Sequence, residues 1–230
     1  METTSAAETC AQKQAIRINH ALTANAEKRL LVWLAERTPQ WVSSDQLTAL
    51  GLIAQMGAGL CYALARCAHW ALVGAILCIA LNWLGDSLDG TLARVRNQQR
   101  PRYGFYVDHL VDVLGATAMM AGLAASGFLH WTTAAAMLVA FLLLASESYL
   151  AACTLAEFRL SQGCFGPTEI RLLLIAGNLA LLHSPYATVF GHRMLLFDLG
   201  GLIATAGMAV LLLTTAARHT AALYRQEPLA

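Results

Sequence analysis

The sequence predicts an all-α fold: a six-helix transmembrane bundle preceded by an interfacial amphipathic helix. Its 230 residues are 57% hydrophobic and 13% charged, and the mean hydropathy is +0.54. Soluble domains carry about 25% charged residues, so this composition is typical of a membrane protein. Six apolar segments, each close to the ~20 residues needed to cross the hydrocarbon layer, set the predicted helix count. The formal net charge of +1 gives no support for nucleic-acid binding.

Two segments precede the first predicted span. Residues 1–24 are polar and lack the apolar core of a secretory signal, which predicts a polar cytoplasmic tail. Residues 25–38 combine basic side chains such as Lys28 with Trp33 and several leucines, and Pro39 follows them. This pattern predicts an amphipathic helix that lies in the headgroup layer and also packs on the bundle.

Residues 39–225 form the predicted membrane domain. Its spans have the approximate limits 47–65, 69–88, 105–126, 130–152, 168–184 and 195–217. Of the 15 Lys and Arg residues, 13 fall in segments predicted to lie inside, and only Arg66 and Arg193 fall in outer loops. By the positive-inside rule, we expect both termini to be cytoplasmic, in an integral protein of the cytoplasmic (inner) membrane.

Four of the six aspartates fall within one 27-residue stretch that joins the second and third spans. They are Asp86, Asp89, Asp108 and Asp112. The first two are three residues apart and the last two are four apart, so each pair lies on one face of a helix. Because the connection between the spans is short, we expect antiparallel neighbouring helices whose carboxylates lie level with one another, on the cytoplasmic side.

This group of carboxylates predicts a divalent metal site. Four carboxylates held close together repel one another unless cations bind between them. Oxygen ligands without His or Cys favour Mg²⁺ or Mn²⁺ over zinc. Four carboxylates can hold two ions about 3.5–4 Å apart, which suits phosphoryl transfer. Gly90 and Ala93 leave room for a substrate, and Arg94 offers a planar donor fork for phosphate. A structural network of Asp–Arg pairs would explain two of the acids, but not four at one depth.

The spacing of these residues resembles the signature of the CDP-alcohol phosphatidyltransferase family. Every signature position is matched, in the order Asp86-x2-Asp89-Gly90-x2-Ala93-Arg94-x9-Gly104-x3-Asp108-x3-Asp112. Upstream, Pro39 and Leu47-Thr48-x2-Gly51 are similar to a weakened form of the family's Pro-Asn-x-Leu-Thr segment. The six helices and interfacial N-terminal helix of that family agree with the spans predicted above. The family often forms dimers, so the resemblance also allows a homodimer.

The resemblance implies a phospholipid-synthesising transferase with a two-metal mechanism. It would move a phosphatidyl group from CDP-diacylglycerol, a CDP-linked lipid donor, to a small polar alcohol acceptor, and release CMP. The four aspartates would bind two Mg²⁺ or Mn²⁺ ions, and Asp112 would also take the proton from the acceptor hydroxyl. Contacts to the CDP moiety would come from Gly90, Ala93, Arg94 and Gly104.

Candidates for the acceptor site lie outside the metal-ligand positions. They are Glu147 in the fourth span, Arg159, Glu169 and Arg171 in and after the following connection, and His109 beside Asp108. Glu147 stands out because an unpaired carboxylate in an apolar span is costly. A structural role is available to each of them as well: an interhelical contact for Glu147, cytoplasmic anchors for the arginines, and a surface position for His109.

Three other functions remain as alternatives. A second branch of the family transfers from CDP-choline or CDP-ethanolamine to diacylglycerol, and Asp108-His109 and Gly166-Pro167-Thr168-Glu169 are similar to that branch. A membrane prenyltransferase also gathers aspartates around Mg²⁺, but it needs a second acidic motif, which Asp198 on the outer side cannot complete. A small divalent-cation transporter would carry acids at mid-membrane or on both sides, rather than in one cluster beside Arg94 and Arg102.

Overall fold

The computed structural model describes residues 16–18, 24–155, 157–159, 166–189 and 191–227. Within these ranges the chain forms seven helices and two small two-stranded sheets. The helices are α2 (Ala24–Arg37), α3 (Ser44–Ala65), α4 (Ala71–Val95), α5 (Pro101–Ser126), α6 (Trp131–Thr154), α7 (Pro167–His183) and α8 (Leu196–Gln226). The predicted all-α class is therefore confirmed. Most of the predicted tail, 1–15 and 19–23, lies outside the described residues.

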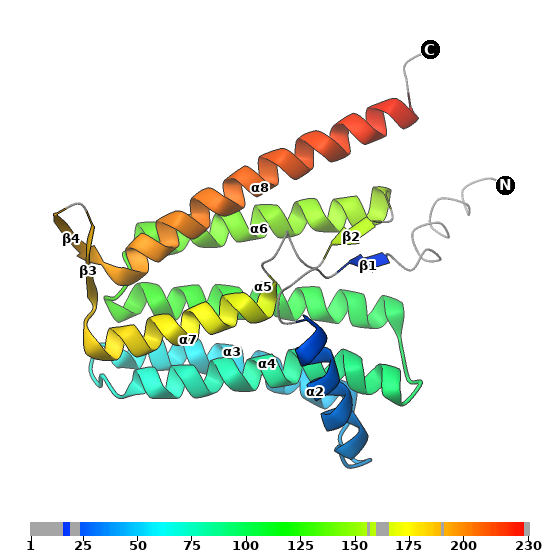
Figure 1. Ribbon diagram of the computed structural model, residues 1–230, viewed down its shortest axis with the longest axis horizontal. Helices are drawn as coiled ribbons and strands as arrows, with labels where there is room; N and C mark the ends of the chain where they lie inside the picture. Colours follow the sequence, from blue (N-terminus) through cyan, green and yellow to red (C-terminus); the bar gives the residue numbers. More distant parts are fainter. Residues whose placement is uncertain (1–15, 19–23, 156, 160–165, 190, 228–230) are drawn as a thin grey trace.

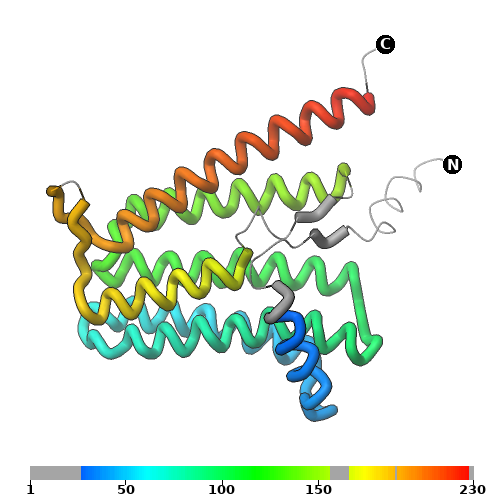
Figure 2. Tube along the Cα trace, viewed as in Figure 1, coloured from blue at the N-terminus to red at the C-terminus, as the bar shows by residue number. Residues whose placement is uncertain are grey.

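The strands are short and lie beside the bundle. β1 (Ile16–Ile18) pairs in parallel with β2 (Glu157–Arg159), and β3 (Tyr186–Val189) pairs antiparallel with β4 (His192–Leu195). The second pair forms the connection between α7 and α8. Consecutive helices from α3 to α8 run in alternating directions (Figures 1 and 2). Helices α6 and α8 form one side of the bundle, α3 and α4 form the other, and α5 and α7 lie between them.

The number of membrane spans differs from the predicted six. Among the described residues, five helices are long and apolar enough to cross a membrane: α3, α4, α5, α6 and α8. Helix α7 coincides with the predicted span at 168–184, but it has only 17 residues. At 1.5 Å per residue it is about 26 Å long, shorter than the ~30 Å hydrocarbon layer. The six-span count is therefore not confirmed.

The two helices that carry the aspartates extend beyond their predicted limits of 69–88 and 105–126. Helix α4 continues to Val95, and α5 begins at Pro101, where the ring of proline suits the first helical turn. The turn between them includes Asn97 in the left-handed conformation, with φ of 54°. All four aspartates consequently lie inside helices rather than at their ends.

Helix α3 is the common neighbour of α4 and α5. It packs extensively on both, whereas α4 and α5, which are described over their whole lengths, make few backbone contacts with each other. The expectation of direct neighbours is therefore corrected: the two helices are antiparallel, but they meet on α3. Glycines permit this packing, since a Cβ added to Gly85 would lie 2.6 Å from the Leu47 carbonyl oxygen, and one at Gly122 would collide with the Gly59 carbonyl.

The largest buried cluster lies at the ends of the helices remote from the aspartates. It includes Tyr62 at the end of α3, Leu72 at the start of α4, and Leu123 and Leu181 near the ends of α5 and α7. The amide of Asn178 donates to the Tyr62 hydroxyl at 2.7 Å, so the buried phenol has a partner. This half of the bundle holds the helices together mainly by apolar packing, whereas the aspartates of the motif lie in the other half.

A second buried cluster attaches the amphipathic helix to the bundle. Leu31 and Ala35 of α2 pack against Leu47 of α3 and against Leu88 and Leu92 of α4. Figure 1 shows α2 crossing α4 in the half of the bundle where the turn connects α4 to α5. The opposite face of α2 exposes its basic residues and Trp33. The packing of this helix on the bundle is confirmed, and its place in the headgroup layer stays a prediction.

Candidate active site

Asp89 is buried between α3 and α4, with 6% of its surface exposed. The Thr48 hydroxyl donates to one carboxylate oxygen at 2.6 Å, and the Gly90 backbone N–H donates to the other at 2.5 Å. The Ser44 hydroxyl donates to the Asp89 backbone carbonyl at 3.0 Å. The position of the carboxylate is thus set by Thr48 of α3 and by the backbone of α4 itself. Thr48 belongs to the Leu-Thr pair of the sequence, but sequence reasoning assigned it no role.

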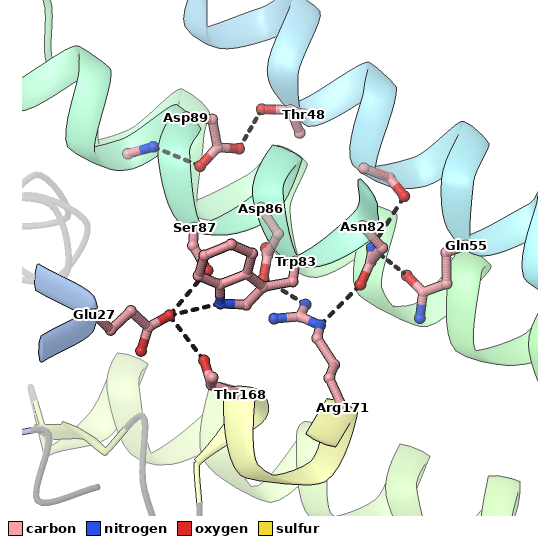
Figure 3. Close-up of polar contacts among 12 residues, drawn as sticks. Glu27, Thr48, Gln55, Asn82, Trp83, Asp86, Ser87, Asp89, Thr168 and Arg171 are labelled. Atoms are coloured by element: carbon pink, nitrogen blue, oxygen red, sulfur yellow. Dashed lines mark hydrogen bonds and ion pairs between the residues drawn. The ribbon is translucent and has the colours of Figure 1, made fainter. Parts of the chain in front are cut away.

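Asp86 lies one turn earlier on α4 and faces α7. Arg171 donates through Nη2 to an Asp86 carboxylate oxygen at 2.6 Å and through Nε to the Asn82 side-chain oxygen at 2.9 Å (Figure 3). Asn82 and Asp86 are four residues apart and therefore share a helix face. One guanidinium is bound in this way to two successive turns of α4, and only 15% of its side chain is exposed.

A chain of polar contacts continues from Asn82 through α3 to α5. The Asn82 amide donates to the Gly51 carbonyl at 3.0 Å and to the Gln55 side-chain oxygen at 3.4 Å (Figure 3). Gln55 packs over Gly115 of α5, where an added Cβ would lie only 3.0 Å from the Gln55 Cγ. Sequence reasoning missed Asn82 and Gln55. The available signal was a polar residue in an apolar span, in the case of Asn82 one helical turn before Asp86.

Asp108 and Asp112 approach this region from α5. Asp112 interacts electrostatically with Asp86, Asp89, Asp108 and Arg171. The structure therefore brings the four aspartates of the sequence motif into one region. Among the described residues, however, no three His, Cys, Asp or Glu side chains are arranged as a ready-made metal-binding group. The donor set nevertheless fits Mg²⁺ or Mn²⁺ in its chemistry, because it consists of mutually repelling carboxylate oxygens.

The residues expected at the CDP moiety lie next to these carboxylates along the chain. Arg94 donates to the Thr91 hydroxyl at 2.8 Å. A Cβ added to Gly90 would come no closer than 3.5 Å to the Arg94 Nη1, and one added to Gly104 would meet no described atom within 4 Å. Packing within the described residues therefore requires glycine at neither position. Ala93 is half-buried on α4.

Two of the candidate acceptor residues have structural partners. Glu147 of α6 forms a hydrogen bond of 2.5 Å with His219 of α8, which is the interhelical contact considered from the sequence. Glu169 accepts the Gly166 backbone N–H at 2.9 Å and thereby caps the first turn of α7. The segment Gly166-Pro167-Thr168-Glu169 is thus the beginning of a helix, with proline at its first position.

The other three candidates differ in their surroundings. The His109 ring packs at a tilt against Phe105, with ring centroids 4.1 Å apart, and contacts Tyr149 of α6 edge to face, with centroids 4.6 Å apart. Arg159 lies in β2, and its side chain is outside what the structure describes. Arg171 is the candidate whose described contacts include a motif aspartate. It is therefore the best supported of the five by geometry.

The fold and this site define an integral membrane protein with a carboxylate-rich centre built from helices α3, α4, α5 and α7. The family model for CDP-alcohol phosphatidyltransferase matches residues 41–220, and the chain belongs to this family. Its members are phospholipid-synthesising transferases of substituted phosphate groups, which use a CDP-linked lipid donor and an alcohol acceptor and generally depend on a metal. The resemblance seen in the sequence is thereby confirmed. A search of curated proteins found no match.

Proposed function

We propose that this protein transfers a phosphatidyl group from CDP-diacylglycerol to the hydroxyl of a small polar alcohol and releases CMP. The observation that carries the proposal is that the four motif carboxylates, two from α4 and two from α5, lie close enough to interact electrostatically. A structural ion-pair network would balance these charges with arginines. Here Arg171 is bound to Asp86, while the carboxylate of Asp89 is held by a hydroxyl and a backbone N–H.

Asp86, Asp89, Asp108 and Asp112 are the residues that would hold two Mg²⁺ or Mn²⁺ ions. Bound there, the ions would neutralise the pyrophosphate and lower the pKa of the acceptor hydroxyl. The hydrogen bonds from Thr48 and Gly90 orient Asp89 before any substrate arrives. This orientation by neighbouring groups supports a ligand role, because a pre-positioned carboxylate loses little side-chain freedom on binding a cation.

The proposed reaction is a single displacement at phosphorus. The acceptor oxygen forms a bond to the phosphorus that carries the diacylglycerol, the phosphoanhydride bond breaks, and CMP leaves with the bonding electrons. The proton of the acceptor hydroxyl passes to a carboxylate oxygen of Asp112. In this assignment Asp112 is the catalytic base, and its place on α5, opposite Asp86 and Asp89 of α4, supports the role.

On the donor side, Gly90, Ala93, Arg94 and Gly104 contact the CDP moiety. Support comes from the glycines, because neither is needed for packing within the described residues. A backbone without side chains allows a nucleotide to approach closely, and the Arg94 guanidinium provides paired donors for phosphate oxygens. This explains glycine at these positions by ligand contact rather than by helix packing.

On the acceptor side, Arg171 is the residue with the strongest support. Its Nη1 is buried, and no described atom accepts a hydrogen bond from it. A buried guanidinium nitrogen without an acceptor is costly, and an oxygen of a polar or anionic acceptor would satisfy it. The likeness of residues 166–169 to the branch that uses CDP-choline has a local explanation, since these residues begin and cap α7.

The proposed topology places α7 as a sixth membrane crossing, with both termini and the aspartates on the cytoplasmic side. The alternating helix directions in Figure 1 support it. The distribution of Lys and Arg supports the same orientation. A reporter that fluoresces only in the cytoplasm, fused to the C-terminus, tests this topology, and we expect it to fluoresce. If it does not, and a reporter that is active only outside the cytoplasm is active in the same position, the C-terminus lies outside and the proposed orientation is wrong.

The experiment that tests the function is CMP release by purified protein in detergent with Mg²⁺. CDP-diacylglycerol is offered with glycerol 3-phosphate, inositol phosphate, serine or choline in turn, and CDP-choline is then offered with diacylglycerol. We expect acceptor-dependent CMP from one pairing with CDP-diacylglycerol. CMP release only from CDP-choline would assign the protein to the branch of the family that uses CDP-choline. No CMP release from any pairing would overturn the proposal.

A further inference from the structure

Glu27 of α2 accepts three hydrogen bonds at a single carboxylate oxygen. Two come from α4, from the Trp83 indole N–H at 2.9 Å and the Ser87 hydroxyl at 3.3 Å. The third comes from the Thr168 hydroxyl in the first turn of α7, at 2.8 Å. Figure 3 shows Glu27 pointing toward these three donors. One carboxylate thereby joins the amphipathic helix to the two helices that form the Arg171–Asp86 contact.

The Glu27 contacts lie next to that ion pair along both helices. Ser87 follows Asp86 directly on α4. Thr168 and Arg171 are three residues apart, so they lie on the same side of α7. The first turn of α7 is therefore linked to the rest of the bundle through Thr168 and Arg171, which bind two different carboxylates.

Attachment of α2 alone does not require this arrangement. The apolar contacts of Leu31 and Ala35 already hold α2 on α3 and α4. The hydrogen bond from Thr168 to Glu27, by contrast, does not help to hold α2 on α4, because Thr168 belongs to a third helix, α7. Glu27 also precedes the part of the chain, 41–220, that matches the family model, so no role is transferred to it from the family.

We infer that Glu27 is a positioning residue, which acts through Thr168 to hold the first turn of α7 so that Arg171 is presented at Asp86. The position of α2 on the bundle is thereby coupled to the position of Arg171, on the acceptor side of the site. This inference rests on the proposed function, in which Arg171 binds the acceptor. It assigns Glu27 no contact with substrate or metal.

Steady-state kinetics of Glu27→Ala test this coupling, with Glu36→Ala as the matched control. Glu36 is an exposed acid on the same helix, so its replacement removes the same charge. We expect Glu27→Ala to lower kcat/KM for the acceptor about tenfold, mainly by raising KM, and Glu36→Ala to leave it unchanged. In an Arg171→Ala background, replacing Glu27 should have almost no further effect, because its action passes through Arg171. Equal losses in the two backgrounds would overturn the inference.

Hydrogen exchange provides a readout that does not depend on activity. Glu27→Ala and Thr168→Val should both speed amide exchange over residues 170–174 of α7, whereas Glu36→Ala should not. Thr168→Val removes the link to α7 while Glu27 keeps its α4 donors, so it remains informative if Glu27→Ala does not fold. Unchanged exchange in Thr168→Val would refute the coupling. Failure of wild-type CMP release with faster exchange in the variants would refute the proposed reaction and retain the coupling.

Discussion

Replacing Arg171 with glutamine should destabilise the metal-free protein, and Mg²⁺ should reverse much of the loss. The wild-type guanidinium donates to Asp86 at 2.6 Å and to Asn82 at 2.9 Å, and 15% of its side chain is exposed. Glutamine is too short to keep both contacts and carries no charge. The variant leaves the Asp86 carboxylate without its cation, in a region that also holds the carboxyl groups of Asp89, Asp108 and Asp112.

The size of the effect follows from the exposure of the two partners. Removing one partner of a fully buried ion pair costs about 3–5 kcal/mol. A hydrogen bond to a charged group contributes about 1.5–3 kcal/mol. Because 36% of the Asp86 side chain is exposed, the range for a hydrogen bond to a charged group applies. We therefore expect the free energy of unfolding to fall by about 2 kcal/mol. For a chain of this size, such a loss lowers the Tm by about 4–8 °C.

Thermal unfolding in detergent, with and without Mg²⁺, measures this change. Arg100→Gln is the matched control, because Arg100 pairs with Asp45 at the surface, where the two side chains are 52% and 48% exposed. An exposed pair of this kind contributes about 0–1 kcal/mol. Mg²⁺ should raise the Tm of Arg171→Gln more than that of the wild type, because a bound cation compensates the charge left on Asp86.

Two results would refute this reasoning. If Arg171→Gln lowers the Tm no more than Arg100→Gln does, the buried ion pair does not contribute to stability as its geometry indicates. If Mg²⁺ raises the Tm of the wild type and of Arg171→Gln equally, Asp86 does not belong to the cation site. The second result would leave the family assignment intact and would require a different set of metal ligands.

Three further substitutions test other parts of the site. Asp112→Asn should abolish CMP release with little change in Tm, because an amide cannot accept the proton; near-normal turnover would exclude Asp112 as the base. Thr48→Val keeps the side-chain shape but removes the hydroxyl that donates to Asp89 at 2.6 Å, so half-maximal activity should require more Mg²⁺, and an unchanged Mg²⁺ titration would contradict this. Gly85→Ala places a Cβ 2.6 Å from a backbone oxygen of α3 and should lower the free energy of unfolding by about 1–3 kcal/mol. In the control Gly200→Ala the added Cβ meets no described atom within 4 Å, so its stability should not fall. Equal Tm values for the two variants would argue against the tight crossing of α3 and α4.

Much of this protein could be predicted from residues that are close together in the chain. The amphipathic segment predicted at 25–38 is α2, and the apolar segments coincide with helices because burial in hydrocarbon depends on local composition. The spacing of the four aspartates placed each pair on one helix face, and the motif predicted the family. The predicted count of six spans is not confirmed, because α7 is only 17 residues long.

The partners of the aspartates were decided by tertiary structure alone. Thr48 and Asp89 are 41 residues apart in the chain, Asp86 and Arg171 are 85 apart, and Glu27 and Thr168 are 141 apart. Hydropathy shows that helices are buried, but it does not show which faces meet. That choice depends on where glycine lets two backbones touch, as where Gly85 of α4 packs against α3. It also depends on which buried polar groups can satisfy one another. For this reason α3 emerged as the common neighbour of the motif helices, and Glu27 as a link between α2, α4 and α7, only when the helices were packed together.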